Sequence, residues 1–256
     1  MAIPWDADTY DASSQPQQSW GAEVLARLKG IPPDAAVLDV GCGTGLVTEG
    51  LLALVPQGRV LAIDQSPEMV ALARARLGDR AWVWCQDVLE LELEHRVDAV
   101  ISTATLHWVP DHDRMWSRLA SALRPGGVLE VQCGGMGNID RVREVIDAVA
   151  GELAPELIGF SPWVFAGPQE TEQRLQRAGF TQIRCWLEER PTYPEDVGSF
   201  VPTSILAAHL ARLSEERRER FAGAVVAGVR LPLDYVRLNV SAVRQVDAST
   251  NRRPVV

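Results

Sequence analysis

The sequence VLDVGCGTG at residues 37–45 decides the fold. Its first half is an apolar run of strand length, and its second half places Gly41, Gly43 and Gly45 at alternate positions. A helical pattern, LVTEGLLALV, follows directly at residues 46–55. A buried strand that turns through glycines into a helix is typical of an α/β domain in which a ligand lies against the backbone of the turn.

Strand-length apolar runs alternate with helical patterns around this turn, beginning with an amphipathic helix expected over residues 15–29. The expected strands are AAVLDV (35–40), RVLAID (59–64), AWVWCQ (81–86), VDAVIST (97–103), VLEVQC (128–133), TQIRCWLEER (181–190) and LDYVRLNVSAV (233–243). Such alternation is the signature of a parallel sheet covered on both faces. The sequence therefore predicts an α/β fold with a doubly wound, mostly parallel seven-stranded sheet whose last strand is reversed.

The length of 256 residues favours one domain with an elaboration. Helical patterns over residues 139–153 and 169–180 fit continued strand–helix–strand winding, whereas two helices over 199–213 and 214–229 are extra. We expect a single domain over residues 1–245, with a helical cap insert at about 195–229. Residues 246–256 lack periodicity and are expected to form a flexible tail.

Composition and charge argue against several classes of protein. Lys and Arg number 25 against 34 Asp and Glu, and the net charge of −9 disfavours nucleic acid as a partner. No apolar run approaches the ~18 residues of a membrane span, and the N-terminus lacks the features of a signal peptide. We expect a cytoplasmic protein with no membrane partner. The four cysteines and four histidines lack ligand spacing, so neither a disulfide framework nor a metal site is expected.

Two further acids follow predicted strands. Asp64 stands 19 residues after Gly45, at a strand tip where a carboxylate can accept hydrogen bonds from both hydroxyls of an adenosine ribose. Asp87 ends the next strand, where it can accept an adenine amino proton while Val88 packs on the ring, or can cap a helix. A dinucleotide fingerprint starting at Gly41 needs glycine at position 46, and Leu46 there disfavours a nicotinamide or flavin oxidoreductase.

Four motifs occur in order: VLDVGCGTG (37–45), VLAIDQSPEM (60–69), CQDV (85–88) and LRPGGVL (123–129). Over roughly residues 10–190 the chain resembles the class I S-adenosylmethionine-dependent methyltransferases. The resemblance implies the Rossmann-like methyltransferase fold and S-adenosyl-L-methionine as cofactor. By this resemblance the methionine portion would contact Asp39, Gly41, Gly43 and Gly45, the ribose Asp64 and Gln65, the adenine Asp87 and Val88, and Ser102 would line the floor.

Two further features are similar to a subgroup of these enzymes. Tyr10 and Gln17 have a Tyr-x6-Gln spacing, and Leu106-His107-Trp108 follows the fourth predicted strand. Both resemble trans-aconitate 2-methyltransferase, the malonyl-carrier-protein methyltransferase of biotin synthesis and juvenile hormone acid methyltransferase, which methylate carboxylates. The resemblance implies that Gln17 and Trp108 anchor the acceptor carboxyl and that Tyr10 belongs to the cofactor site. A purely structural alternative is that Trp108 fills the floor and Gln17 caps the helix.

These observations favour methyl transfer to a carboxylate of a small acid. A carboxylate with a pKa of ~4 is ionised at neutral pH and needs no general base. An acceptor phenol, enol or ring nitrogen would instead need one, and His107 would be the natural base. An O-, N- or C-methyltransferase of a small natural product is therefore an alternative, as is a catalytically silent S-adenosylmethionine-binding protein.

The acceptor side of the site is less determined by the sequence. Phe160, Trp163 and Phe165 can form an aromatic lid over the acceptor or cover the last edge of the sheet. The basic residues are 24 Arg and Lys29 alone, which a compositional bias explains as well as a carboxylate clamp, so no arginine is selected as a ligand. The oligomeric state is left open.

Overall fold

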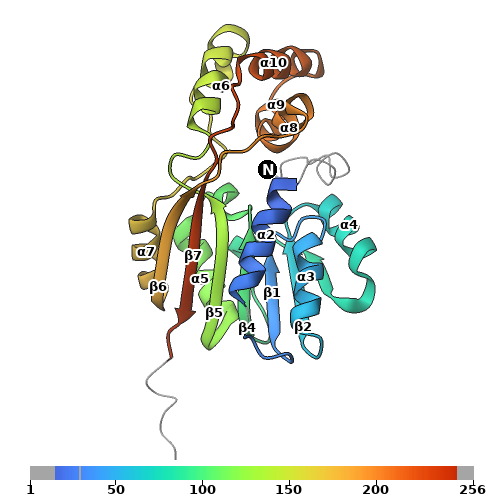
Figure 1. Cartoon of the computed structure of the whole chain (residues 1–256), viewed down its shortest axis with the longest axis vertical. Helices are drawn as coiled ribbons and strands as arrows, with labels where there is room; N and C mark the ends of the chain where they lie inside the picture. Colours follow the sequence, from blue (N-terminus) through green and yellow to red (C-terminus); the bar gives the residue numbers. More distant parts are fainter. Residues whose placement is uncertain (1–14, 29, 247–256) are drawn as a thin grey trace, which may run out of the picture.

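The computed structural model describes residues 15–28 and 30–246 (Figure 1). Its strands are β1 (Ala36–Val40), β2 (Arg59–Asp64), β3 (Trp82–Cys85), β4 (Val97–Thr103), β5 (Leu123–Gly134), β6 (Phe180–Glu189) and β7 (Val236–Arg244). They form one sheet in the order β3-β2-β1-β4-β5-β7-β6, in which β7 is antiparallel to both of its neighbours and the other pairs are parallel. The predicted fold class, including the reversed last strand, is confirmed.

Helices cover both faces of the sheet. They are α2 (Gln15–Arg27), α3 (Leu46–Leu54), α4 (Pro67–Leu77), α5 (His112–Ala122) and α7 (Pro168–Arg177), with short 3-10 turns η1 (Gly78–Arg80), η2 (Val88–Glu90), η3 (Leu106–Trp108) and η4 (Pro155–Leu157). Helices α2, α3 and α4 share one face with the apolar side chains of Val37 and Ala62. Helices α5 and α7 pack on the other face, around Leu38 and Val40. Strand β1 is buried throughout, as a central strand of a two-faced parallel sheet requires.

The start of α4 shows how local sequence sets an element boundary. Ser66 is its N-cap, and its hydroxyl accepts a hydrogen bond from the amide of Met69 at 3.2 Å. Pro67 occupies the first helical position, where its missing N–H costs nothing. This boundary agrees with the motif at residues 60–69 and holds the chain after β2 in one conformation.

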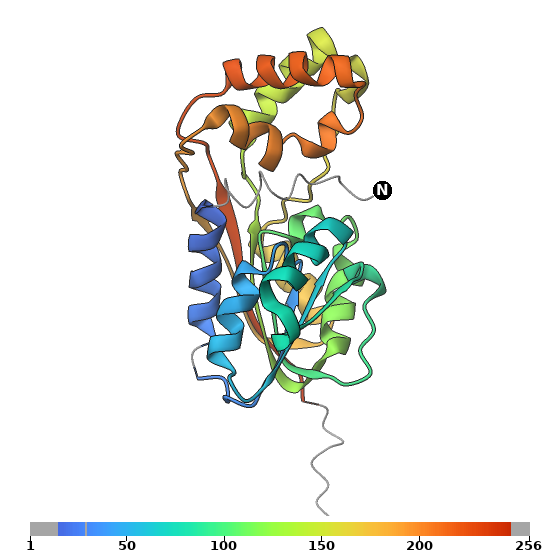
Figure 2. The same cartoon turned by 90° about the vertical axis from the view of Figure 1, so that its right-hand side faces the viewer.

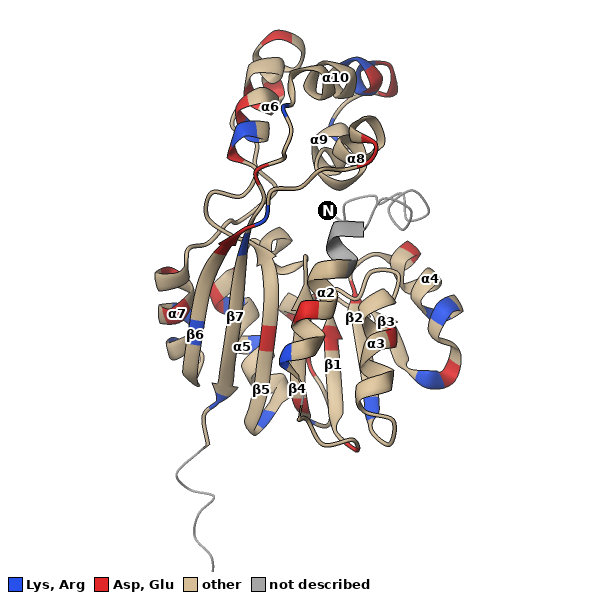
Figure 3. Cartoon of the chain, viewed as in Figure 1, with Lys and Arg blue, Asp and Glu red and all other residues tan. Residues whose placement is uncertain are grey.

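A separate helical layer lies beyond the carboxyl edge of the sheet (Figures 1 and 2). It consists of α6 (Asp140–Leu153), α8 (Val197–Ser204), α9 (Ala207–Leu210) and α10 (Glu215–Gly228). These helices share their own apolar core, in which Val142 and Ile146 of α6 belong to one cluster with Phe221 and Val225 of α10. Acidic and basic residues are spread over both this layer and the sheet domain (Figure 3).

Two sequence-based expectations about this layer are wrong. Helix α6 does not continue the winding on the sheet but packs on α10, because an amphipathic stripe is satisfied by any apolar partner and its period does not identify which. The single helix expected over 199–213 is divided into α8 and α9 around Ile205 and Leu206. Pro202 lies inside α8 and removes one backbone donor there.

The proposed domain limits stay predictions, because residues 1–14 and 247–256 lie outside the described residues. The insert predicted at about 195–229 corresponds to the region of α8, α9 and α10, and the structure adds α6 to the same layer. Among the helices of the described residues, none has the length and apolar character needed to cross a membrane.

Candidate functional site

The carboxyl ends of β1, β2, β3 and β4 meet at the edge of the sheet that faces the helical layer (Figures 1 and 2). The predicted cofactor residues of the described part of the chain lie in the last residues of these strands or directly after them. The amides of Gly41 and Cys42 both donate to the carbonyl of Ile63, at 2.8 and 3.0 Å, which ties the turn after β1 to β2. Ligands of open α/β sheets bind at this edge.

The three glycines of the turn have left-handed backbone conformations, with φ values of 72° at Gly41, 54° at Gly43 and 86° at Gly45. Their surroundings differ. A Cβ at Gly41 would overlap the side chain of Thr105, so Gly41 permits close packing between two loops. A Cβ at Gly43 would meet no atom within 4 Å, so the backbone there borders open space that a ligand can occupy.

Asp39 lies beneath this turn and is fully buried. Its Oδ2 accepts a hydrogen bond from Thr48 Oγ1 at 2.7 Å, whereas Oδ1 has no hydrogen-bond partner within the described part of the chain. Burial raises the pKa of Asp39 to about 7, an effect that the Thr48 hydroxyl opposes and the nearby Asp64 charge reinforces. A buried acceptor oxygen beside an open backbone turn fits the ammonium group of the cofactor's methionine portion.

Asp64 connects two loops through its carboxylate. Oδ2 accepts from the amide of Gly43 and Oδ1 from the amide of Ser66, both at 2.9 Å. Burial raises the pKa of Asp64, although the amide donors act in the opposite direction. Each carboxylate oxygen keeps further acceptor capacity, which suits a ribose diol. The neighbouring Gln65 is exposed at this edge.

Asp87 is exposed and caps η2, with Oδ1 accepting from the amide of Leu89 at 2.8 Å. The capping alternative raised by the sequence is therefore observed, and it orients the carboxylate at the predicted adenine position. Val88 is buried in the core cluster on the α5 face. Ser102 is also fully buried, and its hydroxyl donates to the carbonyl of Val40 at 2.7 Å, which links β4 to β1 without a ligand.

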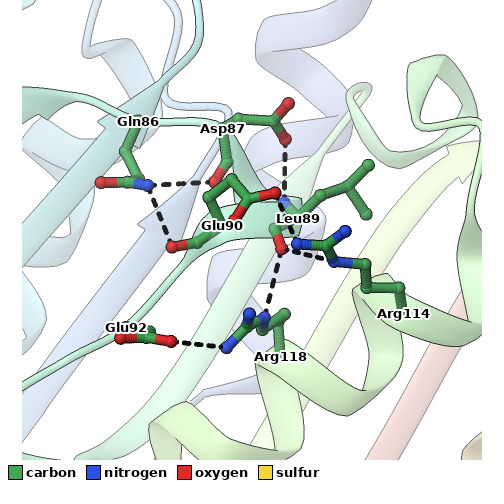
Figure 4. A network of polar contacts seen from close by, with 7 residues as sticks. All are labelled: Gln86, Asp87, Leu89, Glu90, Glu92, Arg114 and Arg118. Carbon is green, nitrogen blue, oxygen red and sulfur yellow. Dashed lines mark hydrogen bonds and ion pairs between the residues drawn. The ribbon is translucent and has the colours of Figure 1, made fainter.

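Two arginines of α5 hold the loop that carries Asp87 and Val88, and sequence analysis did not select them (Figure 4). The Nε atoms of Arg114 and Arg118 donate to the same carbonyl, that of Leu89, at 2.9 and 3.2 Å. Arg114 also pairs with Glu90, and Arg118 with Glu92 at 3.0 Å. The sequence contained acids at 90 and 92 and arginines at 114 and 118, but only the fold brings them together.

His107 of η3 is buried, and its Nδ1 accepts a hydrogen bond from the amide of Gly134 at 3.2 Å. The ring stacks on Phe165, with centroids 5.7 Å apart. Burial, and secondarily the charge of Arg237, lowers the pKa of His107 well below its usual value of 6.5. The ring is therefore neutral at physiological pH, and because Nδ1 accepts, the proton resides on Nε2.

Trp108 is half-buried next to His107, with ring centroids 5.3 Å apart, and 5.6 Å from the ring of Trp163. Trp163 in turn stacks on Phe165 and lies 5.3 Å from His209 of α9. The aromatic segment around Trp163 therefore joins η3 to the helical layer. A role of this segment as a lid stays a prediction.

Two of the predicted site residues, Tyr10 and Gln17, lie near the N-terminus. Tyr10 lies outside the described residues. Gln17 belongs to α2, but its side chain is also outside what the structure describes. Helix α2 lies against the sheet, with Trp20 and Val24 buried. Helix α2, whose range includes Gln17, begins at the end of the sheet that faces the helical layer (Figures 1 and 2).

Replacing Gly43 by alanine tests whether the open space at the turn belongs to the cofactor. A Cβ would project into that space, and we expect Gly43→Ala to weaken S-adenosylmethionine binding at least ~10-fold by calorimetry. Gly78→Ala is the matched control, because Gly78 has a similar φ of 56° and also open surroundings, but lies outside the site. Equal affinities of the two variants would contradict this assignment.

Removing the two α5 arginines tests whether the loop they hold serves the cofactor. The double variant Arg114→Ala, Arg118→Ala should raise the KM for S-adenosylmethionine roughly 3- to 10-fold at unchanged kcat, because the loop loses two charged donors. Arg124→Ala is the control, since its ion pair with Asp98 lies at the opposite edge of the sheet. A fall in kcat alone would exclude this role.

A family model described as a methyltransferase domain matches residues 37–127, which contain the strands and turns of this edge. Trans-aconitate 2-methyltransferase from Azoarcus sp. strain BH72 is 35% identical over 231 residues, covering 88% of this chain and 89% of that protein. Malonyl-[acyl-carrier protein] O-methyltransferase from Priestia megaterium is 32% identical over 139 residues, covering 53% of this chain and 51% of that protein.

Several other trans-aconitate 2-methyltransferases are matched over only 50% to 67% of their length. Among solved structures, phosphoethanolamine N-methyltransferase 2 of Haemonchus contortus, with S-adenosylhomocysteine bound, has a TM-score of 0.65 at 18% identity. The match covers 94% of this chain and 57% of that one, and it supports the fold alone. The residues at the carboxyl edge of the sheet and the similarity to the Azoarcus protein lead to the same conclusion. This chain belongs to the S-adenosylmethionine-dependent methyltransferase family that includes the trans-aconitate 2-methyltransferases.

Proposed function

We propose that this methyltransferase acts on a carboxylate oxygen of a small organic acid and forms a methyl ester. The observation that carries the proposal is the state of His107, the titratable side chain of η3. Its ring is neutral, and its acceptor nitrogen is engaged by the amide of Gly134. An acceptor that must lose a proton would need a base here, whereas a carboxylate is ionised already. The carboxyl-methylating relatives support the same chemistry.

When bound, S-adenosylmethionine supplies an electrophilic methyl group on a sulfonium. The residues of this chain then have three tasks: to hold the acceptor oxygen in line, to orient its carboxylate and to exclude water. Positioning of this kind can provide much of the rate enhancement of a displacement reaction. We assign the orienting hydrogen bonds to the indole N–H of Trp108 and the side-chain amide of Gln17, both neutral donors.

The helical layer is proposed to select the acceptor. It lies over the carboxyl edge, and the Trp163 segment connects it to η3 beside Trp108. A layer in this place limits access of water to the reacting groups and shapes the space around the acceptor. No specific observation favours the alternatives of a base-dependent natural-product methyltransferase or a silent cofactor-binding protein.

Product chemistry tests the proposal directly. Incubation with labelled S-adenosylmethionine and a panel of small acids that includes trans-aconitate should give a methyl ester that mild alkali cleaves. Gln17→Ala and Trp108→Phe should each lower turnover roughly 10- to 100-fold, because the reacting geometry loses a hydrogen bond. Trp82→Phe is the control, since Trp82 is 61% exposed on β3. Unchanged turnover in Trp108→Phe would contradict its orienting role.

The pH dependence separates the carboxylate from the alternative acceptors. Because the pKa of His107 lies well below 6.5, its ring stays neutral at higher pH, and the wild-type rate should be flat from about pH 6.5 to 8.5. His107→Asn should keep this flat profile, since an amide oxygen can also accept from Gly134. A wild-type titration near pH 6.5 that disappears in His107→Asn, with an alkali-stable product, would overturn the ester proposal.

A further inference from the structure

His112 is a buried histidine beside the candidate site, and sequence analysis did not select it. It is the first residue of α5, and 4% of its surface is exposed. Its Nε2 lies 3.2 Å from the carbonyl oxygen of Leu106, the first residue of η3. A carbonyl oxygen can only accept, so Nε2 carries the proton and donates it. The side chain of His112 therefore ties the backbone of η3 to the start of α5.

The other ring nitrogen of His112 faces Arg174 of α7. Nη1 of Arg174 lies 3.5 Å from Nδ1, which accepts because the proton is on Nε2. Burial, and secondarily the charge of Arg174, lowers the pKa of His112 below its usual value of 6.5. The ring is therefore neutral at physiological pH, and it uses one nitrogen as a donor and the other as an acceptor.

Neighbouring side chains fix the directions of both Arg174 and the imidazole. Nη2 of Arg174 pairs with Glu170 one turn earlier on α7 at 2.7 Å, and its Nε lies 3.7 Å from Asp113 of α5. The ring of His112 meets that of Trp116 edge to face, with centroids 6.3 Å apart. A side chain whose own rotamer is locked by packing and hydrogen bonds can hold a neighbouring group in one geometry.

The turn η3 is held at two successive carbonyls by two different elements. The carbonyl of Leu106 accepts from His112 of α5. The carbonyl of His107 accepts from the amide of Val164, in the aromatic segment around Trp163, at 2.8 Å. Trp108 is the third residue of this short turn. The direction of its indole therefore depends on both supports, and only one of them comes from the helical layer.

We propose that His112 is a positioning residue of the reaction, which orients Trp108 through η3 and is itself oriented by Arg174. The inference rests on the proposed function, in which the indole N–H of Trp108 holds the acceptor carboxylate. The reacting oxygen must stay in line with the methyl group, and a misplacement of about 1 Å can lower the rate about 100-fold. In this assignment His112 and Arg174 act through the backbone of η3.

Substitutions that remove or keep the donor test the inference. The acceptor is the acid of the panel described above that the wild type esterifies fastest. His112→Phe keeps a ring against Trp116 but cannot donate to Leu106. We expect its kcat/KM for this acid to fall roughly 10- to 30-fold, chiefly in kcat, with affinity for S-adenosylhomocysteine unchanged. His112→Gln has a terminal amide that can donate in place of Nε2, and it should stay within about 3-fold of wild type.

A double-mutant cycle tests whether Arg174 acts through His112. Arg174→Gln should lower kcat/KM roughly 3- to 10-fold in the wild-type background, but should cause no further loss in His112→Phe. Arg177→Gln is the control, because Arg177 is an exposed residue of the same helix that pairs with Asp113 at 2.7 Å. It should leave all kinetic constants unchanged. An equal loss from Arg174→Gln in both backgrounds would contradict an action through His112.

Hydrogen exchange gives a measurement that needs no acceptor. The amides of Trp108 and Val109 close η3 on the carbonyls of Thr105 and Leu106, at 2.9 and 3.2 Å. In His112→Phe the exchange of these two amides should rise at least ~10-fold, because the turn loses its support from α5. Exchange in α4, on the other face of the sheet, should remain as in the wild type.

The outcomes separate a positioning role from a packing role. A lower Tm of His112→Phe with wild-type kcat would overturn the inference, as would losses in His112→Gln equal to those in His112→Phe. Ester formation in the same assays would leave the proposed function standing. If His112→Phe does not fold, wild-type kcat in Arg174→Gln overturns the inference.

A last outcome distinguishes the inference from the function on which it rests. If the wild type esterifies no acid of the panel, the proposed function fails. The exchange of the Trp108 and Val109 amides then decides the inference: a rise confined to η3 in His112→Phe supports the positioning of this turn, and unchanged exchange overturns it.

Discussion

The carboxylate of Asp64 holds two loops in one arrangement, and the cofactor side of the site depends on it. By accepting from the amides of Gly43 and Ser66, it fixes the glycine turn after β1 relative to the start of α4. The parallel direction of β1 and β2 makes this contact possible, since both strands end at the same edge. The backbone is therefore shaped before any ligand is bound, which reduces the ordering that binding requires.

The cofactor side could be predicted from sequence because each of its parts is local. Each of these parts lies within a few residues of the end of a strand: the three glycines, Asp64, the α4 N-cap Ser66, and Asp87. The periodicity of the strands locates these ends in the sequence. The acceptor side is assembled from distant segments. Trp108, Trp163 and His209 are neighbours only because α6 leaves the sheet and α9 returns above it, and no periodic pattern encodes that partnership.

The roles of the arginines could not be predicted from the sequence for the same reason. The arginines at 114, 118 and 237 looked alike in a sequence whose basic residues are almost all arginine. In the structure, Arg114 and Arg118 hold a loop at the surface. Arg237, by contrast, is a buried residue of β7 whose side chain lies against Trp20 of α2. Burial and partners, which distinguish these side chains, follow from strand order and from the placement of α2, and both are properties of the whole fold.

The position of β7 has a consequence for biosynthesis. Among the described residues it is the last strand in sequence order, yet it lies between β5 and β6. Until Val236–Arg244 has emerged from the ribosome, β5 and β6 have no contact along the sheet, and each exposes unpaired backbone groups. A nascent chain that already contains the complete cofactor turn therefore still carries two open edges, the condition under which partly folded proteins aggregate. The seven-stranded sheet is closed between β5 and β6 only after β7 has been synthesised.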